Sequence, residues 1–149
     1  MIEAVFDTNI LLQAASSKDG PSAACWRFAE ERKIRVFLTE QILRELEDVL
    51  NRPKVRNQFP RLTDSHVSNM LAAYRAYSSL VAEPSAEFQL DRDKDDAKFV
   101  DLANWTGATF IVSWDNDLLE LSKDLDFISR FPAFSIVTPV GFLEIVRTI

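Results

Sequence analysis

Short apolar runs of strand length alternate along the chain with longer stretches in which apolar residues recur every three or four positions. The short runs fit buried parallel strands, and the longer stretches fit helices with one apolar face. Strands are expected at residues 2–6, 34–38, 108–113 and 134–137, with a weak candidate at 80–82. Helices are expected at residues 21–33, 39–50, 95–106, 118–121 and 139–145, and another starts at residue 63, with helical spacing of apolar residues that reaches residue 80. This alternation predicts an α/β fold with three layers (α/β/α) and a mainly parallel central sheet.

Proline, threonine and glycine mark several of the expected helix ends. Pro21 suits the first turn of a helix, and Thr39 is a good N-cap for the helix that follows the second strand. Pro53 ends that helix, and Gly107 suits the C-terminal cap of a later one. The polar, proline-bearing residues 51–60 are expected to connect this helix to the next one.

The chain has 149 residues, which fits one domain spanning residues 1–149. Its single cysteine, Cys25, excludes an internal disulfide and a cysteine-based zinc site, and its single histidine, His66, argues against zinc hydrolases and histidine-based triads. No apolar run is long enough to cross a membrane, and no signal peptide precedes the first strand. We therefore expect a cytoplasmic protein with no membrane partner.

Acidic residues follow two of the predicted strands. Asp7 comes directly after the first strand, and Asp115 comes shortly after the strand that ends at Ser113. Open α/β sheets bind their ligands at the carboxyl ends of their strands. Each acid also has an ordinary structural explanation, as the cap of a helix that starts at Thr8 or Asn9, or as a turn residue. Two strands that end in an acid at the same edge nevertheless favour a site.

Two further groups of acids are less well defined by their pattern. In the helix after the second strand, Glu45 and Glu47 flank the apolar stripe on opposite sides, and periodicity does not choose between them. Further along, Asp93, Asp95 and Asp96 precede a helix, and three acids exceed what one cap requires. Both groups are candidates for the same site.

Convergence of these acids would place several like charges in one small volume. Each charge would disfavour ionisation of its neighbours unless a cation lay among them. Carboxylate oxygens are the ligands that suit Mg²⁺ or Mn²⁺. The pattern therefore predicts a divalent-metal enzyme, and hydrolysis of phosphodiesters is the chemistry that such a site best supports.

The net charge of −6 argues against a protein that coats nucleic acid, because such binding depends on basic faces. It is compatible with a nuclease, since bound metal would neutralise part of the excess acid. Basic residues cluster at Arg52, Lys54 and Arg56, either as solvated charges or as contacts to an RNA backbone. Trp114 is a candidate for stacking on a base.

Taken together, the motifs resemble the PIN domain, the small metal-dependent nuclease fold of VapC-like bacterial toxins. The resemblance covers nearly the whole chain. Its main motifs are Phe6-Asp7-Thr8-Asn9-Ile10-Leu11, Ile42-Leu43-Arg44-Glu45-Leu46, Asp93-Lys94-Asp95-Asp96-Ala97-Lys98-Phe99, Ile111-Val112-Ser113-Trp114-Asp115-Asn116-Asp117 and Ile136-Val137-Thr138-Pro139. The resemblance implies a metal-dependent endoribonuclease that hydrolyses RNA phosphodiester bonds and acts as the toxin of a type II toxin–antitoxin system.

The resemblance also assigns roles to individual residues. It selects Glu45 over Glu47 as the second acid and implies one or two Mg²⁺ or Mn²⁺ ions. The implied catalytic and metal-binding residues are Asp7, Glu45, Asp96 and Asp115, with Asp117 as an additional metal ligand. The residues expected to orient them or the phosphate are Thr8, Asn9, Ser113 and Asp93. Lys94 and Trp114 depart from the family pattern, which often has proline and glycine there.

The expected partners are an RNA substrate, a small antitoxin protein and a second copy of the chain in a homodimer. A PIN-type nuclease that processes RNA without being a toxin stays open. A phosphoryl-transfer or phospho-receiver domain is disfavoured because position 9 is Asn and residues 134–141 contain no lysine. A non-catalytic binding module would need every acid to be a cap or a solvated charge.

Overall fold

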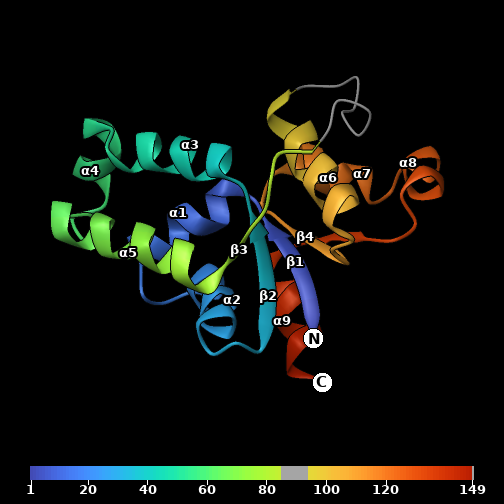
Figure 1. Cartoon of the computed structure of the whole chain (residues 1–149), viewed down its shortest axis with the longest axis horizontal. Coiled ribbons are helices and arrows are strands. Elements are labelled where there is room, and N and C mark those ends of the chain that lie inside the picture. Colours follow the sequence, from blue (N-terminus) through green and yellow to red (C-terminus); the bar gives the residue numbers. More distant parts are fainter. Residues whose placement is uncertain (85–93, 149) are drawn as a thin grey trace.

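The computed structural model describes residues 1–84 and 94–148, with side chains from residue 97 onward in the second range (Figure 1). Within these residues, five strands form one parallel sheet in the order β3-β2-β1-β4-β5. The strands are β1 (Ile2–Phe6), β2 (Ile34–Leu38), β3 (Ser79–Leu80), β4 (Phe110–Val112) and β5 (Ser135–Val137). The helices are α1 (Thr8–Ser16), α2 (Pro21–Glu30), α3 (Glu40–Leu50), α4 (Pro53–Gln58), α5 (Asp64–Tyr77), α6 (Lys94–Thr106), α7 (Asn116–Leu121), α8 (Leu125–Arg130) and α9 (Pro139–Arg147).

Helices cover both faces of the sheet. Helix α2 packs on β2 and against α1 and α9, whereas α6 packs on β1 and β4, with the sheet between the two groups (Figure 1). The chain runs from β1 outward to β2 and β3 and then returns through α6 to β4. The strand order therefore reverses between β1 and β4, where open α/β sheets place their ligands. The predicted three-layer α/β/α fold with a parallel sheet is confirmed.

The central strands are buried because helices cover both of their faces. Phe6 in β1 and Ile111 and Val112 in β4 have no exposed surface. Full burial of each such side chain stabilises the fold by roughly 1.5–3 kcal/mol. The core therefore holds the carboxyl ends of β1 and β4 firmly, just before Asp7 and Ser113.

Several helix ends lie where the sequence predicts them, but two short helices, α4 and α8, were not predicted. Thr39 caps α3 by accepting a hydrogen bond from the amide of Ile42, as predicted. Residues 51–60, predicted as a polar connection, contain the short helix α4, which was not predicted: Pro53 lies in the first turn of this new helix. The sequence pattern also does not predict α8, which Asp124 caps. Among the described residues, no helix is both long and apolar enough to cross a membrane.

Candidate active site

Asp7 lies directly after β1, where its backbone N–H donates to the carbonyl of Val112 in β4 (3.0 Å). Its side chain is buried, with only 7% of the residue exposed, which is unusual for an aspartate. Asp7 occupies the N-cap position of α1 without a well-formed side-chain capping hydrogen bond, although the backbone N–H groups of Asn9 and Thr8 act to lower its pKa. Helix capping does not require burial, so capping alone does not explain why an acid is buried here.

Ser113 joins the ends of β1 and β4 through its side chain. Its fully buried hydroxyl donates to Oδ2 of Asp7 (2.5 Å) and accepts the N–H of Asp115 (2.9 Å). Asp115 in turn caps α7, because its Oδ1 accepts the amide of Asp117 (2.8 Å). One hydroxyl thus fixes the Asp7 carboxylate relative to the backbone of Asp115.

The environment of Asp7 makes ionisation of its carboxyl group less favourable than in water while no cation is present. Burial is the main cause that raises the pKa of Asp7 above its ordinary value. The hydrogen bond from Ser113 opposes this rise, and the negative charge of Asp115 adds to it. A desolvated carboxylate beside a second acid gains more from a nearby cation than a solvated carboxylate does.

Two buried oxygen atoms beside Asp7 have no hydrogen-bond partner among the described residues, namely Oγ1 of Thr8 and Oδ1 of Asn9. Both residues line the same cavity as Asp7, and Nδ2 of Asn9 donates to Oδ2 of Asp7 (3.4 Å). An unpaired buried oxygen is costly, so such atoms normally find a partner. Carboxylate, hydroxyl and amide oxygens together fit a hard divalent cation and its water ligands.

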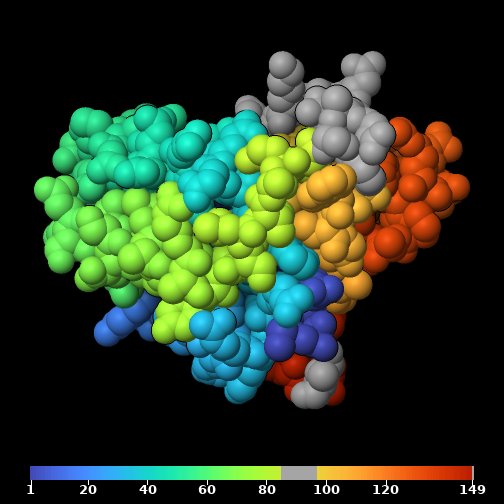
Figure 2. Space-filling model, in the orientation of Figure 1, coloured from blue at the N-terminus to red at the C-terminus, as the bar shows by residue number. Residues whose placement is uncertain are grey.

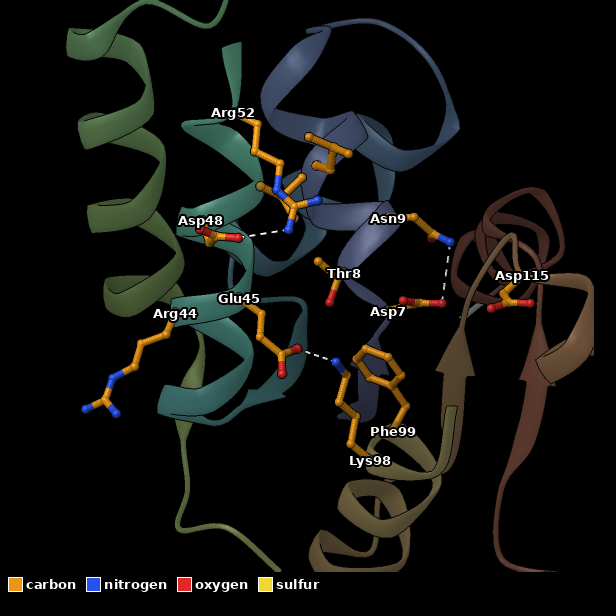
Figure 3. Close-up of a pocket in the computed structure, with 12 residues that line it drawn as sticks. Asp7, Thr8, Asn9, Arg44, Glu45, Asp48, Arg52, Lys98, Phe99 and Asp115 are labelled. Carbon is orange, nitrogen blue, oxygen red and sulfur yellow. Dashed lines mark hydrogen bonds and ion pairs between the residues drawn. The ribbon is translucent and has the colours of Figure 1, made fainter. Parts of the chain in front are cut away.

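Glu45 faces the same cavity from α3 (Figure 3). Its carboxylate forms an ion pair with Lys98 of α6 and accepts a 3.4 Å hydrogen bond from Gln41. Glu47 is exposed and does not line the cavity. Of the two glutamates that periodicity left open, Glu45 is the one that the fold brings toward Asp7.

The cavity has a volume of about 680 Å³ and lies between α1, α3 and α6. In the space-filling view, α3 to α5 form one lobe of the molecule, and α6 and α8 lie in another (Figure 2). Four acidic and three basic side chains line the cavity, an excess of one negative charge. These charged residues are Asp7, Glu45, Asp48, Asp115, Arg44, Arg52 and Lys98.

Three of the predicted acids are not among the described residues that line the cavity. Asp93 and the side chain of Asp96 lie outside the described residues, so their roles stay predictions. Asp117 does not line the cavity, and its backbone amide donates the hydrogen bond by which Asp115 caps α7. Within the described part of the chain, no three acidic, histidine or cysteine side chains are close enough to hold a metal ion. The described acids alone therefore do not form a metal site.

Of the four residues predicted to contact RNA, Arg52 lines the cavity, where it pairs with Asp48 (2.8 Å). Lys54 is exposed in the first turn of α4, away from the cavity lining. Arg56 does not line the cavity and ties α4 to its neighbours, so its contact with RNA stays a prediction. Its guanidinium donates to the carbonyls of Leu50 and Leu62 and to the side chains of Asn51 and Asp64.

Trp114 does not line the cavity. Its Nε1 donates to Oε1 of Gln13 (2.6 Å) and to Oγ of Ser22 (3.2 Å). The ring packs against the core and anchors the turn before Asp115 to α1 and α2. These contacts give Trp114 an anchoring role, and its stacking on a base stays a prediction.

Sequence reasoning missed three charged residues of the cavity: Arg44, Asp48 and Lys98. Asp48 lies three positions after Glu45, on the same helical face, so its position was open to prediction once Glu45 was chosen. Lys98 carried no such signal, because a lysine early in a helix is usually a solvated charge.

Comparisons with known proteins agree with this geometry. The model of the PIN domain family matches residues 3–117, which include β1, α3, α6 and Asp115. An uncharacterized protein of Methanocaldococcus jannaschii is 26% identical over 144 residues, covering 96% of this chain and 90% of that protein.

A solved structure shares the fold. It is the crystal structure of VapBC2 from Rickettsia felis bound to a DNA fragment from their promoter. The match has a TM-score of 0.58 at 13% sequence identity and covers 92% of this chain and 98% of that chain. The family match, the parallel sheet and the strand-end acids lead to one conclusion: the chain belongs to the PIN domain family, whose members are nucleases.

Proposed function

We propose that this PIN domain is a divalent-metal-dependent endoribonuclease and the toxin of a type II toxin–antitoxin system. One observation carries the proposal: the buried carboxylate of Asp7, held by Ser113 beside Asp115 at the reversal of strand order. Keeping a desolvated acid next to a second acid costs stability, and a cation between them would offset that cost.

The residues of the cavity fit a Mg²⁺ or Mn²⁺ ion. Asp7, Glu45 and Asp115, with Asp96 from the family pattern, would hold one or two ions, and Asp117 would assist. The bound cation supplies an acidified water and neutralises charge on the reacting phosphate. Ser113 would keep the Asp7 carboxylate in one orientation, and the unpaired oxygens of Thr8 and Asn9 would accept hydrogen bonds from water in the site.

Two arginines support a nucleic-acid substrate. Arg44 in α3 and Arg52, directly before α4, lie at the edge of the cavity and are exposed, so their guanidinium groups would contact phosphates of a strand that runs past it. The choice of RNA as substrate rests on the resemblance to VapC-like toxins. The antitoxin partner rests on that resemblance and on the VapBC2 fold neighbour. A basic side chain of the antitoxin would enter the cavity and pair with its carboxylates, and the toxin would act as a homodimer.

Cleavage of labelled single-stranded RNA, with Mn²⁺ or with a chelator, tests the nuclease. Asp7→Asn should lower the cleavage rate by about a thousandfold or more, since it removes a central cation ligand. Glu47→Gln is the matched control, because it makes the same acid-to-amide change on an exposed residue outside the cavity, and it should cleave normally. Wild-type cleavage by Asp7→Asn, or cleavage in excess chelator, would contradict the proposal.

The toxin role has its own test. Expression of the wild-type chain without an antitoxin should slow growth, and expression of Asp7→Asn should not. If the wild-type protein cleaves RNA in vitro but leaves growth unchanged, and no small protein co-purifies with it, the chain is a PIN-type RNA-processing nuclease and the toxin role is wrong.

A further inference from the structure

Lys98 is a cavity residue that the proposed hydrolysis leaves without a role. It lies in α6, and its ammonium group pairs with Oε2 of Glu45 in α3, so the pair bridges two helices across the cavity (Figure 3). The side chain of Lys98 is 20% exposed and that of Glu45 is 37% exposed, so the pair is partly shielded from solvent. Nζ also lies 5.2 Å from the centroid of the Phe99 ring, an apolar surface that strengthens nearby electrostatic interactions.

The other basic residues of the cavity are placed differently. Arg44 extends away from the cavity (Figure 3), and the side chain of Arg52 is 60% exposed and paired with Asp48. Lys98 alone among the described basic residues of the lining pairs with an acid of the predicted metal-binding set. Removal of its charge would double the negative excess of the described lining, from one to two.

We propose that Lys98 is an internal counter-cation that changes partner during the reaction. It neutralises Glu45 until a divalent cation takes that carboxylate, and it then binds a phosphate oxygen of the RNA strand. This inference rests on the proposed function, because it concerns the same cation and the same substrate.

Electrostatics dictate both halves of this role. A carboxylate that binds a divalent cation has little attraction left for an ammonium group, and the two cations repel each other at short range. The released ammonium stays on a flexible four-carbon stem inside the cavity, where it can donate three hydrogen bonds to an anion. Lys98 therefore opposes binding of the divalent cation and favours binding of the phosphodiester.

Lys98→Met tests this role, because methionine keeps much of the side chain and removes the charge. Lys123→Met is the matched control, since it breaks an exposed lysine–glutamate pair, with Glu120, outside the cavity. Mn²⁺ affinity is measured without RNA, by titration of the thermal unfolding temperature. RNA affinity is measured by fluorescence anisotropy of a labelled single-stranded RNA in Ca²⁺, which slows hydrolysis. Lys98→Gln is measured alongside in case the methionine variant does not fold.

Lys98→Met should bind Mn²⁺ about three- to tenfold more tightly and RNA about three- to tenfold more weakly, the range expected for one partly screened charge. Lys98→Arg should restore the RNA affinity, and Lys123→Met should change neither value. In a Glu45→Gln background, Lys98→Met should no longer tighten Mn²⁺ binding, because the carboxylate for which the two cations compete is gone.

Unchanged Mn²⁺ affinity or unchanged RNA affinity in Lys98→Met would overturn this role. If the wild-type protein binds Mn²⁺ and cleaves RNA while Lys98→Met only unfolds at a lower temperature, Lys98 is a structural link between α3 and α6, and the proposed function stands. A wild-type protein that binds neither Mn²⁺ nor RNA overturns the proposed function together with this role.

Discussion

The two sides of the cavity hold their acids in different ways. At the strand edge, Asp7 is buried, fixed by backbone hydrogen bonds and locked to Asp115 through Ser113. On the helix side, Glu45 is partly exposed and its charge is balanced by Lys98. A buried, fixed carboxylate lowers the stability of the metal-free fold, but it is already placed to bind a cation. A carboxylate paired with a lysine on a helix lowers stability less, but it must leave the lysine before it binds a cation. The strand edge is preorganised, and the helix side is adjustable.

Of the variants that test this difference between the two sides, removal of the Ser113 hydroxyl should lower the cleavage rate most. Ser113→Ala leaves the Asp7 carboxylate without its main hydrogen bond, so cleavage should fall by about 10- to 100-fold, the range typical for residues that orient metal ligands. Cleavage rates in saturating Mn²⁺ measure this loss. Removal of the hydrogen bond from Gln41 to Glu45, by Gln41→Ala, should matter far less. Equal losses in both variants would mean that the strand edge is no more preorganised than the helix side.

The cost of burying Asp7 should show in the pH dependence of stability. The pKa of Asp7 is raised in the folded protein, so the folded state holds this proton more tightly than the unfolded chain does. The metal-free protein should therefore lose stability as the pH rises from the ordinary value of 3.8 through the raised pKa.

Asp7→Asn, which cannot ionise, should be the more stable protein at neutral pH in chelator, and the difference should vanish in acid. Each kcal/mol gained would raise the unfolding temperature by about 2–4 °C. Thermal unfolding of both proteins across this pH range gives the difference. A wild-type protein that is more stable than Asp7→Asn at neutral pH would show that the carboxylate is already compensated without a cation.

The smallest effect is expected at Trp114. Trp114→Phe removes the indole hydrogen bonds to Gln13 and Ser22, which should lower the free energy of unfolding by about 1 kcal/mol. RNA affinity should stay unchanged in Trp114→Phe and in Trp114→Leu, because the ring lies outside the cavity lining. A loss of about 1–3 kcal/mol of RNA binding in Trp114→Leu would restore the stacking role that the sequence suggested.

The same contrast explains what could be predicted from the sequence. Strand ends are easy to locate, because an apolar run stops at a polar residue, and parallel strands bring their carboxyl ends together. The placement of Asp7 near Asp115 followed from this rule alone. Periodicity placed Glu45 and Glu47 at the flanks of a helix without choosing between them, since the choice depends on which neighbour covers each flank.

The features that escaped prediction depend on tertiary contacts. The partner of Lys98 lies 53 positions away in the chain, and no local pattern distinguishes a lysine inside a cavity from one in solvent. Arg56 belongs to a basic cluster in the sequence, yet its four acceptors belong to the structure around α4. Pro53 was interpreted as the end of one helix, although proline equally starts the next one.

The hydrogen bond from Ser113 to Asp7 joins residues 106 positions apart. Asp7 and Ser113 come together only when β4 pairs with β1, a contact between segments far apart in the chain. A folding intermediate in which β1 and β2 have paired but β4 has not docked therefore lacks the hydrogen bond that holds the Asp7 carboxylate. With the proposed activity, such an intermediate would be inactive, and the catalytic acids would become aligned only in one of the late, non-local steps of folding.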